Sequence, residues 1–224
     1  MRDVLEVLLL ALALYIVIAF ALQTVRVDGE SMLPTLNNND LLFADKLSYH
    51  LHAPGRGDIV VFQPTDEPNR DFIKRIIAIP GDWVEIDGKH RNADGTTSPA
   101  VLIKSCQTCT PQQLGETYLP DQSRDPWSVE TYCCDSEGRA TQEPEWLNVP
   151  KDRYFMLGDN RNHSRDSRQI GLQPRNNIIG RAWIRIWPLR GVGFLGAGPT
   201  VTGAVVLPMP LWSLRRRMRR HAAA

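Results

Sequence analysis

The sequence lacks any strong excess of one charge. Its 26 Lys and Arg residues almost cancel its 25 Asp and Glu residues, which leaves a net charge of +1. This balance argues against a broad basic face for nucleic acid and excludes an acidic, disordered chain. The 224 residues also lack internal repeats, low-complexity tracts and a collagen-like glycine period. The length is that of one or two domains with a sizeable core.

The charges that are present are unevenly distributed along the chain. Residues 191–224 contain five arginines and no acidic residue, whereas residues 88–150 contain five basic and nine acidic residues. The pattern therefore divides the chain into a main body, a mildly acidic middle stretch and a basic tail.

Charge is absent from residues 7–22, which are rich in Leu and Ala. With its flanks this run approaches the roughly 20 residues that a membrane-spanning helix needs. A cleaved signal peptide is one interpretation, with a cleavage site at residues 19–21. An uncleaved anchor is the other, and the length of the apolar run favours it. We predict a transmembrane anchor over residues 1–22, spanning at 4–22, and either interpretation exports the chain that follows.

Cysteine is scarce and confined to the acidic middle stretch, at Cys106, Cys109, Cys133 and Cys134. An even number of cysteines in an exported region predicts disulfides, and four cysteines allow three pairings. The pairing that joins Cys133 to Cys134 is disfavoured because it closes a strained ring. The alternatives are unpaired thiols and a zinc site. Cys106 and Cys109 have the spacing of zinc ligands, but the adjacent pair Cys133 and Cys134 lacks the usual separation.

No segment after the N-terminal run shows a sustained helical period, and the body is predicted to be mostly β. Runs of β-branched and apolar residues are separated by Pro, Gly, Asn and Asp. They lie at residues 41–43, 59–62, 72–79, 83–86, 101–103, 154–157 and 178–187.

The predicted domains follow from these runs. We expect the main β domain to comprise residues 23–87 and 151–190. The polar stretch 88–150 is too long for a plain loop, so it is predicted to be an inserted, Cys-containing subdomain. In the segment 191–224, residues 191–212 carry no charge but are rich in Pro and Gly. These residues form a poor helix, so we expect this segment to lie against the membrane surface rather than to cross it.

Three short segments carry residues suited to catalysis. Ser31 lies between Gly29, which permits a sharp turn, and Pro34, and a serine on a tight turn suits nucleophilic attack. Lys74 follows Phe72 in an apolar run, where residues 72, 74, 76 and 78 of a strand share one face. Desolvation there lowers the pKa of a lysine and makes it a usable base, although such a lysine is more often only packed along its stem. Residues 158–168 form a polar segment without an aliphatic side chain.

Together these segments resemble the bacterial type I signal peptidases, which are membrane-anchored serine peptidases. The matching stretches follow the family's order and are residues 29–36, 40–43, 57–62, 72–82, 158–168 and 179–182. They cover most of residues 23–190, whereas 88–150 and 191–224 match no motif.

The resemblance implies that Ser31 is the nucleophile and Lys74 the general base, a Ser-Lys variant of the serine-peptidase triad. It also implies supporting and substrate-binding residues and a coiled antiparallel β fold with a membrane-facing apolar surface. By the same resemblance, Ser164 orients the lysine amine. An ionic scaffold is formed by Arg75, Asp159, Asp166 and Arg168. The substrate pockets are lined by Val25, Leu36 and Ile73.

The sequence departs from the family pattern at two positions. Gly29 stands where many members have a serine that helps to hold the oxyanion, so the oxyanion hole is expected to depend on the Ser31 N–H. His163 stands where asparagine is common, and we interpret it as a solvated neighbour rather than a base. The resemblance implies no metal and no cofactor.

The implied partners are preproteins that carry signal peptides, and the lipid bilayer; no nucleic acid is expected. An extended substrate would add a strand beside residues 25–28 and 71–74, with cleavage after small residues of the Ala-x-Ala type. We expect a monomer in the cytoplasmic membrane, single-pass, with its catalytic domain on the extracytoplasmic side. Two alternatives stay open: a Ser-Lys peptidase that matures one dedicated substrate, such as a conjugative pilin, and a non-enzymatic exported β module. Self-cleaving repressor relatives are disfavoured because the chain has an apolar N-terminus and no helical DNA-binding segment.

Overall fold

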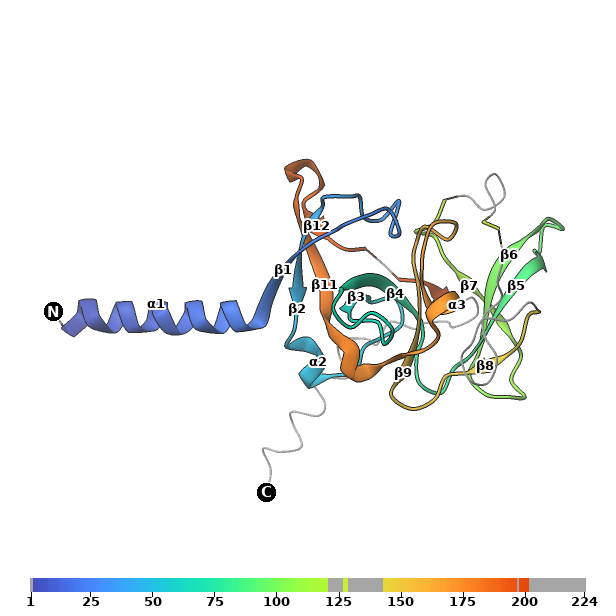
Figure 1. The fold of residues 1–224 in the computed structure, drawn as a ribbon, viewed down its shortest axis with the longest axis horizontal. Coiled ribbons are helices and arrows are strands. Elements are labelled where there is room, and N and C mark those ends of the chain that lie inside the picture. The colour runs from blue at the N-terminus through green and yellow to red at the C-terminus, as the bar shows by residue number, and fades with distance from the viewer. Residues whose placement is uncertain (1, 121–126, 129–142, 197, 202–224) are drawn as a thin grey trace, which may run out of the picture.

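The computed structural model describes residues 2–120, 127–128, 143–196 and 198–201. Helix α1 (Arg2–Ala21) projects away from a body built almost wholly of strands (Figure 1). Among the described residues it is the one helix long and apolar enough to span a membrane, with a mean hydropathy of 2.8 over Val4–Ala21 and none of that window buried in protein. The helix ends at Ala21, one residue before the predicted end of the anchor, because Leu22 already begins a strand.

The first sheet contains eight strands, and all its pairings are antiparallel. Its order is β1-β2-β11-β3-β4-β9-β10, with β12 paired to β11. The bounds are β1 (Leu22–Arg26), β2 (Leu41–Asp45), β3 (Ile59–Phe62), β4 (Phe72–Ala78), β9 (Arg153–Leu157), β10 (Gln173–Pro174), β11 (Ile178–Trp187) and β12 (Gly193–Phe194). The sheet curls around β3 and β4 (Figure 1). The predicted mostly β, coiled antiparallel fold is confirmed, and β1 and the short strands lie outside the runs from which strands were predicted.

The second sheet contains five antiparallel strands in the order β13-β7-β6-β5-β8. The bounds are β5 (Trp83–Arg91), β6 (Thr97–Lys104), β7 (Gln112–Gly115), β8 (Leu147–Asn148) and β13 (Thr200–Val201). This sheet begins at Trp83 rather than at residue 88, and it takes one strand from beyond residue 190. The remaining elements are α2 (Ser48–Leu51), α3 (Ser167–Ile170) and the 3-10 turns Arg175–Asn177 and Leu189–Gly191.

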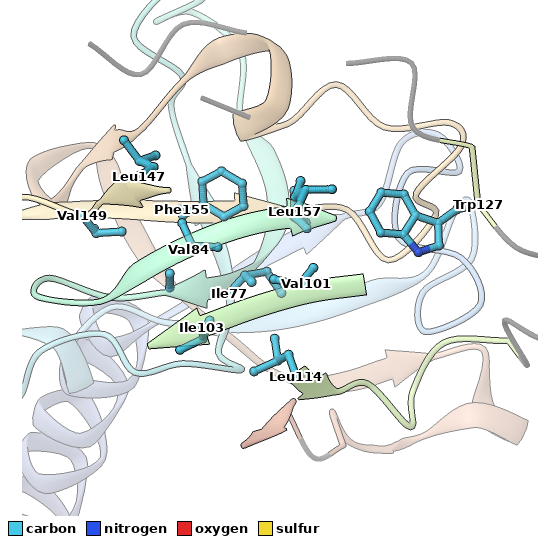
Figure 2. Close-up of a cluster of buried hydrophobic side chains, with 12 residues drawn as sticks. Ile77, Val84, Val101, Ile103, Leu114, Trp127, Leu147, Val149, Phe155 and Leu157 are labelled. Atoms are coloured by element: carbon cyan, nitrogen blue, oxygen red, sulfur yellow. The ribbon is translucent and has the colours of Figure 1, made fainter. Parts of the chain in front are cut away.

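The two sheets share a hydrophobic core. Ile77 of β4 and Leu157 of β9 pack in one buried cluster with Val84 and Val101 of the second sheet (Figure 2). Trp127 belongs to the same cluster and lies at its edge, beyond Leu157 (Figure 2). The first sheet and the sheet formed mainly by the middle stretch are therefore packed together.

Strand β4 corrects one prediction about side-chain faces. Phe72 and Ile76 pack in one hydrophobic cluster, as the alternation predicts. Ala78, predicted to share their face, packs instead beside Ile77. The reason is a register irregularity between Ile76 and Ala78 where β4 pairs with β9, which shifts the alternation by one residue.

The cysteines are partly accounted for. A disulfide joins Cys106 to Cys109, with 5.1 Å between the two Cα atoms. The oxidised pair offers no thiolate to a metal, so it does not fit the alternative of a zinc site. Cys133 and Cys134 lie outside the described residues, as do residues 202–224, on which the prediction for the tail largely depends.

Candidate active site

Ser31 lies on a turn just after β1, and buried side chains hold that turn in place. Gly29 has a φ of +96°, a conformation that glycine adopts without strain, and its N–H donates a hydrogen bond to Asn38 Oδ1 over 3.1 Å. Met32 and Leu36, which follow Ser31, are buried in one hydrophobic cluster. The turn is therefore anchored on both sides of the serine.

The polar loop at residues 158–168 packs directly against this turn. The Asn160 N–H donates to the Ser31 carbonyl oxygen over 3.0 Å, and the Asn160 side chain donates to the Glu30 carbonyl oxygen over 3.1 Å. A Cβ atom at Gly158 would lie 2.1 Å from Ser164 Oγ and 2.5 Å from the Ser31 carbonyl oxygen. Only glycine therefore lets the loop approach the serine this closely.

Lys74 of β4 reaches the same serine from the neighbouring part of the sheet. Its Nζ lies 2.7 Å from Ser31 Oγ and donates a hydrogen bond to the Ile73 carbonyl oxygen over 3.0 Å. The Lys74 amine stands 5.4 Å from the centroid of the Phe72 ring, and the residue is only 3% exposed. The structure thus brings together the two residues that the sequence assigned to the reaction.

The surroundings of Lys74 favour its neutral form. Burial lowers the pKa of the amine to about 8, because a buried ammonium loses its hydration. The nearby carboxylates of Asp166 and Asp159 oppose this shift, while Arg168 reinforces it. A lysine with this pKa is neutral in a useful fraction of molecules near neutral pH, unlike an exposed lysine.

An ion pair between Arg75 and Asp159 lies behind the two reactive side chains. Arg75 Nε and Nη2 donate to the two carboxylate oxygens of Asp159 over 2.9 and 2.7 Å. The Thr35 hydroxyl donates to the same carboxylate over 2.5 Å, and Arg75 Nη1 donates to the Gly57 carbonyl oxygen over 3.1 Å. The pair therefore ties the serine turn to β4 and to the loop at residues 158–168.

A second ion pair, between Asp166 and Arg168, lies in the same loop. Arg168 donates to both carboxylate oxygens, over 2.8 and 2.9 Å, and the Gly158 N–H donates to Asp166 over 3.0 Å. Burial alone would raise the pKa of Asp166, but the Arg168 guanidinium and these hydrogen bonds hold that pKa below its usual value. Asp166 therefore stays ionised close to Lys74.

Ser164 stands between these groups without the contact that the resemblance implies. Among the described contacts its buried hydroxyl makes no hydrogen bond to Lys74, and the hydrogen bonds of the Lys74 amine go to Ser31 and Ile73. Its role in orienting the lysine remains a prediction.

A cleft of about 560 Å³ opens beside the serine and the lysine. Its walls are residues 23–32 and 70–74, so Val25 and Ile73 line it as expected, together with Met32 and Phe72. Leu36 is fully buried beneath the cleft and does not line it. His163 borders the cleft, but among the described contacts its imidazole bonds neither Ser31 nor Lys74.

Sequence reasoning overlooked several residues of the site. Thr35 and Asn160 lie inside the matching motifs, but the sequence does not reveal their hydrogen-bond partners, which are Asp159 for Thr35 and the carbonyl oxygens of Glu30 and Ser31 for Asn160. Tyr118 and Trp127 lie in the stretch without any motif, and no sequence signal connects them to the site. The described residues contain no group of His, Cys, Asp and Glu arranged to hold a metal ion.

The chain is similar to known proteins. The family described as "Signal peptidase, peptidase S26" matches residues 1–187. A signal peptidase I from Leptolyngbya laminosa is 39% identical over 181 residues, which cover 78% of this chain and 73% of the relative. Signal peptidase I P from Bacillus subtilis subsp. natto is 32% identical, with 84% of this chain and 89% of the relative covered.

Two further similarities come from a mitochondrial protein and a crystal structure. The human mitochondrial inner membrane protease subunit 1 is 31% identical, with 76% of this chain and 73% of the relative covered. A crystal structure of a signal peptidase I from Enterococcus faecalis V583 is 27% identical, with a TM-score of 0.39, and covers 58% of this chain and 97% of the other.

These matches define the class of the protein as a serine peptidase, a hydrolase. The chain belongs to the signal peptidase family, peptidase S26, and its relatives named above support the activity of a signal peptidase I. The alternative of a non-enzymatic β module is therefore wrong.

Proposed function

We propose that this protein cleaves signal peptides from exported preproteins through a Ser31–Lys74 dyad and an acyl-enzyme. The observation that carries the proposal is the 2.7 Å separation of Lys74 Nζ from Ser31 Oγ, with the lysine buried. A serine needs an adjacent base to become a nucleophile, and here the neutral amine is the one base within hydrogen-bond distance among the described residues.

The reaction follows from this geometry. Ser31 Oγ attacks the scissile carbonyl carbon while its proton passes to Lys74 Nζ. The resulting ammonium gives that proton to the leaving amine as the peptide bond breaks, which leaves an ester on Ser31. Water then attacks the ester carbonyl carbon while Lys74 Nζ accepts a proton from it. The bond between Ser31 Oγ and the acyl carbon breaks, Lys74 returns the proton to Ser31 Oγ, and the signal peptide leaves with a free carboxyl group.

The oxyanion is held mainly by the backbone at the turn. Gly29 brings no hydroxyl to this point, and within the part of the chain that is described the Ser31 N–H has no hydrogen-bond partner. A free N–H at the nucleophile can donate to an oxyanion when the carbonyl is attacked.

Two open strand edges support binding of an extended substrate. β1 pairs with β2 on one side, and β4 pairs with β9 only from Arg75 onward. In the described structure, β1 and residues 72–74 therefore each have one edge free, and both border the cleft. A peptide strand can hydrogen-bond to such an edge and place alternate side chains in shallow pockets beside Val25 and Ile73, which favours small residues.

The apolar helix supports a membrane location. We propose that α1 anchors a monomer in the cytoplasmic membrane in a single pass, with the cleft on the extracytoplasmic side. The window Val4–Ala21 is apolar, with Glu6 as its one charged residue, and none of it is buried in protein, so lipid is the environment that suits it.

Incubation of the full-length, detergent-solubilised protein with several unrelated preproteins tests the function. Mass spectrometry of the products should show cleavage after Ala-x-Ala type sites, abolished in Ser31→Ala and retained in the control Ser105→Ala, whose serine is exposed. Activity in Ser31→Ala would overturn the mechanism. Cleavage of a single preprotein alone would support the alternative of a dedicated substrate.

A further inference from the structure

The stretch between β6 and β8 matches no catalytic motif, yet three of its side chains contact arginines behind the active site. Two of these arginines, Arg75 and Arg168, belong to the ionic scaffold, and Arg161 lies in the loop at residues 158–168. Arg75 stands with its guanidinium carbon 3.9 Å from the centroid of the Tyr118 ring. Trp127 lies 5.3 Å from the guanidinium carbon of Arg161 and 5.6 Å from that of Arg168. These distances are within the range in which an aromatic face attracts a cation.

The third contact is an ion pair. Glu116 accepts hydrogen bonds from both terminal nitrogens of Arg161, one of them over 2.9 Å, and the Tyr118 hydroxyl donates to Glu116 over 2.6 Å. Arg161 is 4% exposed and its Nε donates to the Gly158 carbonyl oxygen over 3.1 Å. Gly158 is the residue that packs against the Ser31 turn. The middle stretch is thus joined to the active-site loop by charge as well as by packing.

We propose that Tyr118 and Trp127, here named the aromatic cap, are positioning residues for the Ser31–Lys74 reaction. The aromatic cap covers the arginines of the scaffold and excludes water from them. The arginines in turn hold Asp159 and Asp166 in place, and these two carboxylates face Lys74. This inference rests on the proposed function and gives the inserted stretch a part in catalysis.

Burial supports this chain of contacts. Trp127 is 4% exposed and packs in the core shared by the two sheets, beyond Leu157 (Figure 2). Leu157 is the last residue of β9, and the active-site loop begins at the next residue. Displacement of the aromatic cap would therefore open the loop to water at the point where it leaves the sheet.

The expected effect on Lys74 has a definite sign. Charged groups act on this amine from two sides of the site. Asp159, Asp166 and Arg168 face it from the loop, and the groups that line the cleft are Arg26, Asp28, Glu30, Arg70, Asp71, His163 and Arg165. Loss of the aromatic cap lets water in and loosens Arg75 from Asp159. Both changes stabilise the ammonium, so the pKa of Lys74 rises and less of the amine is neutral.

The test is the pH dependence of kcat/KM for the full-length enzyme on a short peptide with an Ala-x-Ala site. In Tyr118→Leu the acidic limb should move to higher pH. If the limb moves by about one pH unit, kcat/KM below it should fall about tenfold and recover at alkaline pH. Tyr118→Phe keeps the ring and should keep the wild-type limb. Trp146→Leu is the matched control, because Trp146 stacks on Lys104 in the same stretch, 4.1 Å from its Nζ, with no contact to the scaffold arginines among the described residues.

An unchanged limb in a folded Tyr118→Leu, or an equal displacement in Trp146→Leu, would overturn the inference while the proposed function stands. If Tyr118→Leu does not fold, Trp127→Leu carries the same expectation and the same refutation. Absence of cleavage by the wild-type enzyme, or full activity in Ser31→Ala, would instead overturn the proposed function and this inference with it.

Discussion

Arg75 and Asp159 form a bidentate ion pair, and their side chains are only 1% and 0% exposed. Another arginine of the protein, Arg165, pairs with Asp66 at the surface, where the two side chains are 42% and 45% exposed. The chain therefore contains a buried and an exposed pair of the same chemical kind, and they should differ sharply in their effect on stability.

Asp159→Asn should lower the free energy of unfolding by about 3–5 kcal/mol, because it leaves the Arg75 charge buried without its counterion. Asp66→Asn should lower it by less than about 1 kcal/mol, because Arg165 is exposed to water and keeps its ion pair with Glu67. Urea denaturation of the wild type and both variants measures the difference. Equal losses in the two variants would contradict the scaffold role of the buried pair.

Lys74→Met should raise the free energy of unfolding above that of the wild type, and this gain should be larger near neutral pH than at alkaline pH. The folded-state pKa is about 8 against an ordinary value of 10.5, so charging this lysine costs the folded state about 3 kcal/mol. The cost is fully present below pH 8, declines as the pH rises and is absent above 10.5, where both states hold the neutral amine. The gain from removing the amine should follow the same course.

Chemical denaturation at neutral pH and above 10.5 checks this expectation, with Lys89→Met as the control because Lys89 is exposed. A Lys74→Met gain that does not change with pH, or one that Lys89→Met reproduces, would argue against a buried, easily deprotonated lysine.

The sequence predicted the long strands well because their β-branched runs, such as residues 59–62 and 178–187, are bounded by turn residues. It predicted the proximity of Ser31 and Lys74, which lie 43 residues apart, through the motifs and not through spacing. Strand β1 was overlooked because its five residues follow the apolar helix directly. Ala78 lies on the face opposite to the predicted one, because the register of β4 shifts where it pairs with β9. Such a shift depends on the partner strand and cannot be predicted from β4 alone.

The contacts of the middle stretch could not be predicted from sequence. Tyr118 meets Arg75 only because β6 and β7 bring it back over β4 and β9, and no local pattern encodes that path. Leu36 was placed in the pocket by resemblance, whereas the core beneath the turn surrounds it completely.

The Cys106–Cys109 disulfide should be detectable as a link within one peptide of the unreduced protein. Its ring is short, with a sequence separation of 3, so reduction should lower the free energy of unfolding by only about 2 kcal/mol. Peptidase activity should persist because neither cysteine touches Ser31 or Lys74 in the described structure. Peptide mapping before and after reduction checks the link, and free thiols at both positions in the unreduced protein would refute it.

His163→Ala should retain most of the peptidase activity. His163 borders the cleft but bonds neither reactive side chain among the described contacts, so its removal should alter substrate contacts and not proton transfer. Initial rates at saturating and subsaturating peptide separate kcat from KM. A loss of kcat as large as that of Ser31→Ala would transfer the role of base to the histidine.

The pH dependence of kcat/KM on an Ala-x-Ala peptide tests the dyad most directly, with the fold verified at each pH. If neutral Lys74 is the base, kcat/KM rises with pH along a limb centred near 8, and Lys74→Met abolishes activity at every pH. His163→Ala should leave that limb in place. A limb near the ordinary histidine pKa of about 6.5, lost in His163→Ala, would contradict the assignment of Lys74 as the base.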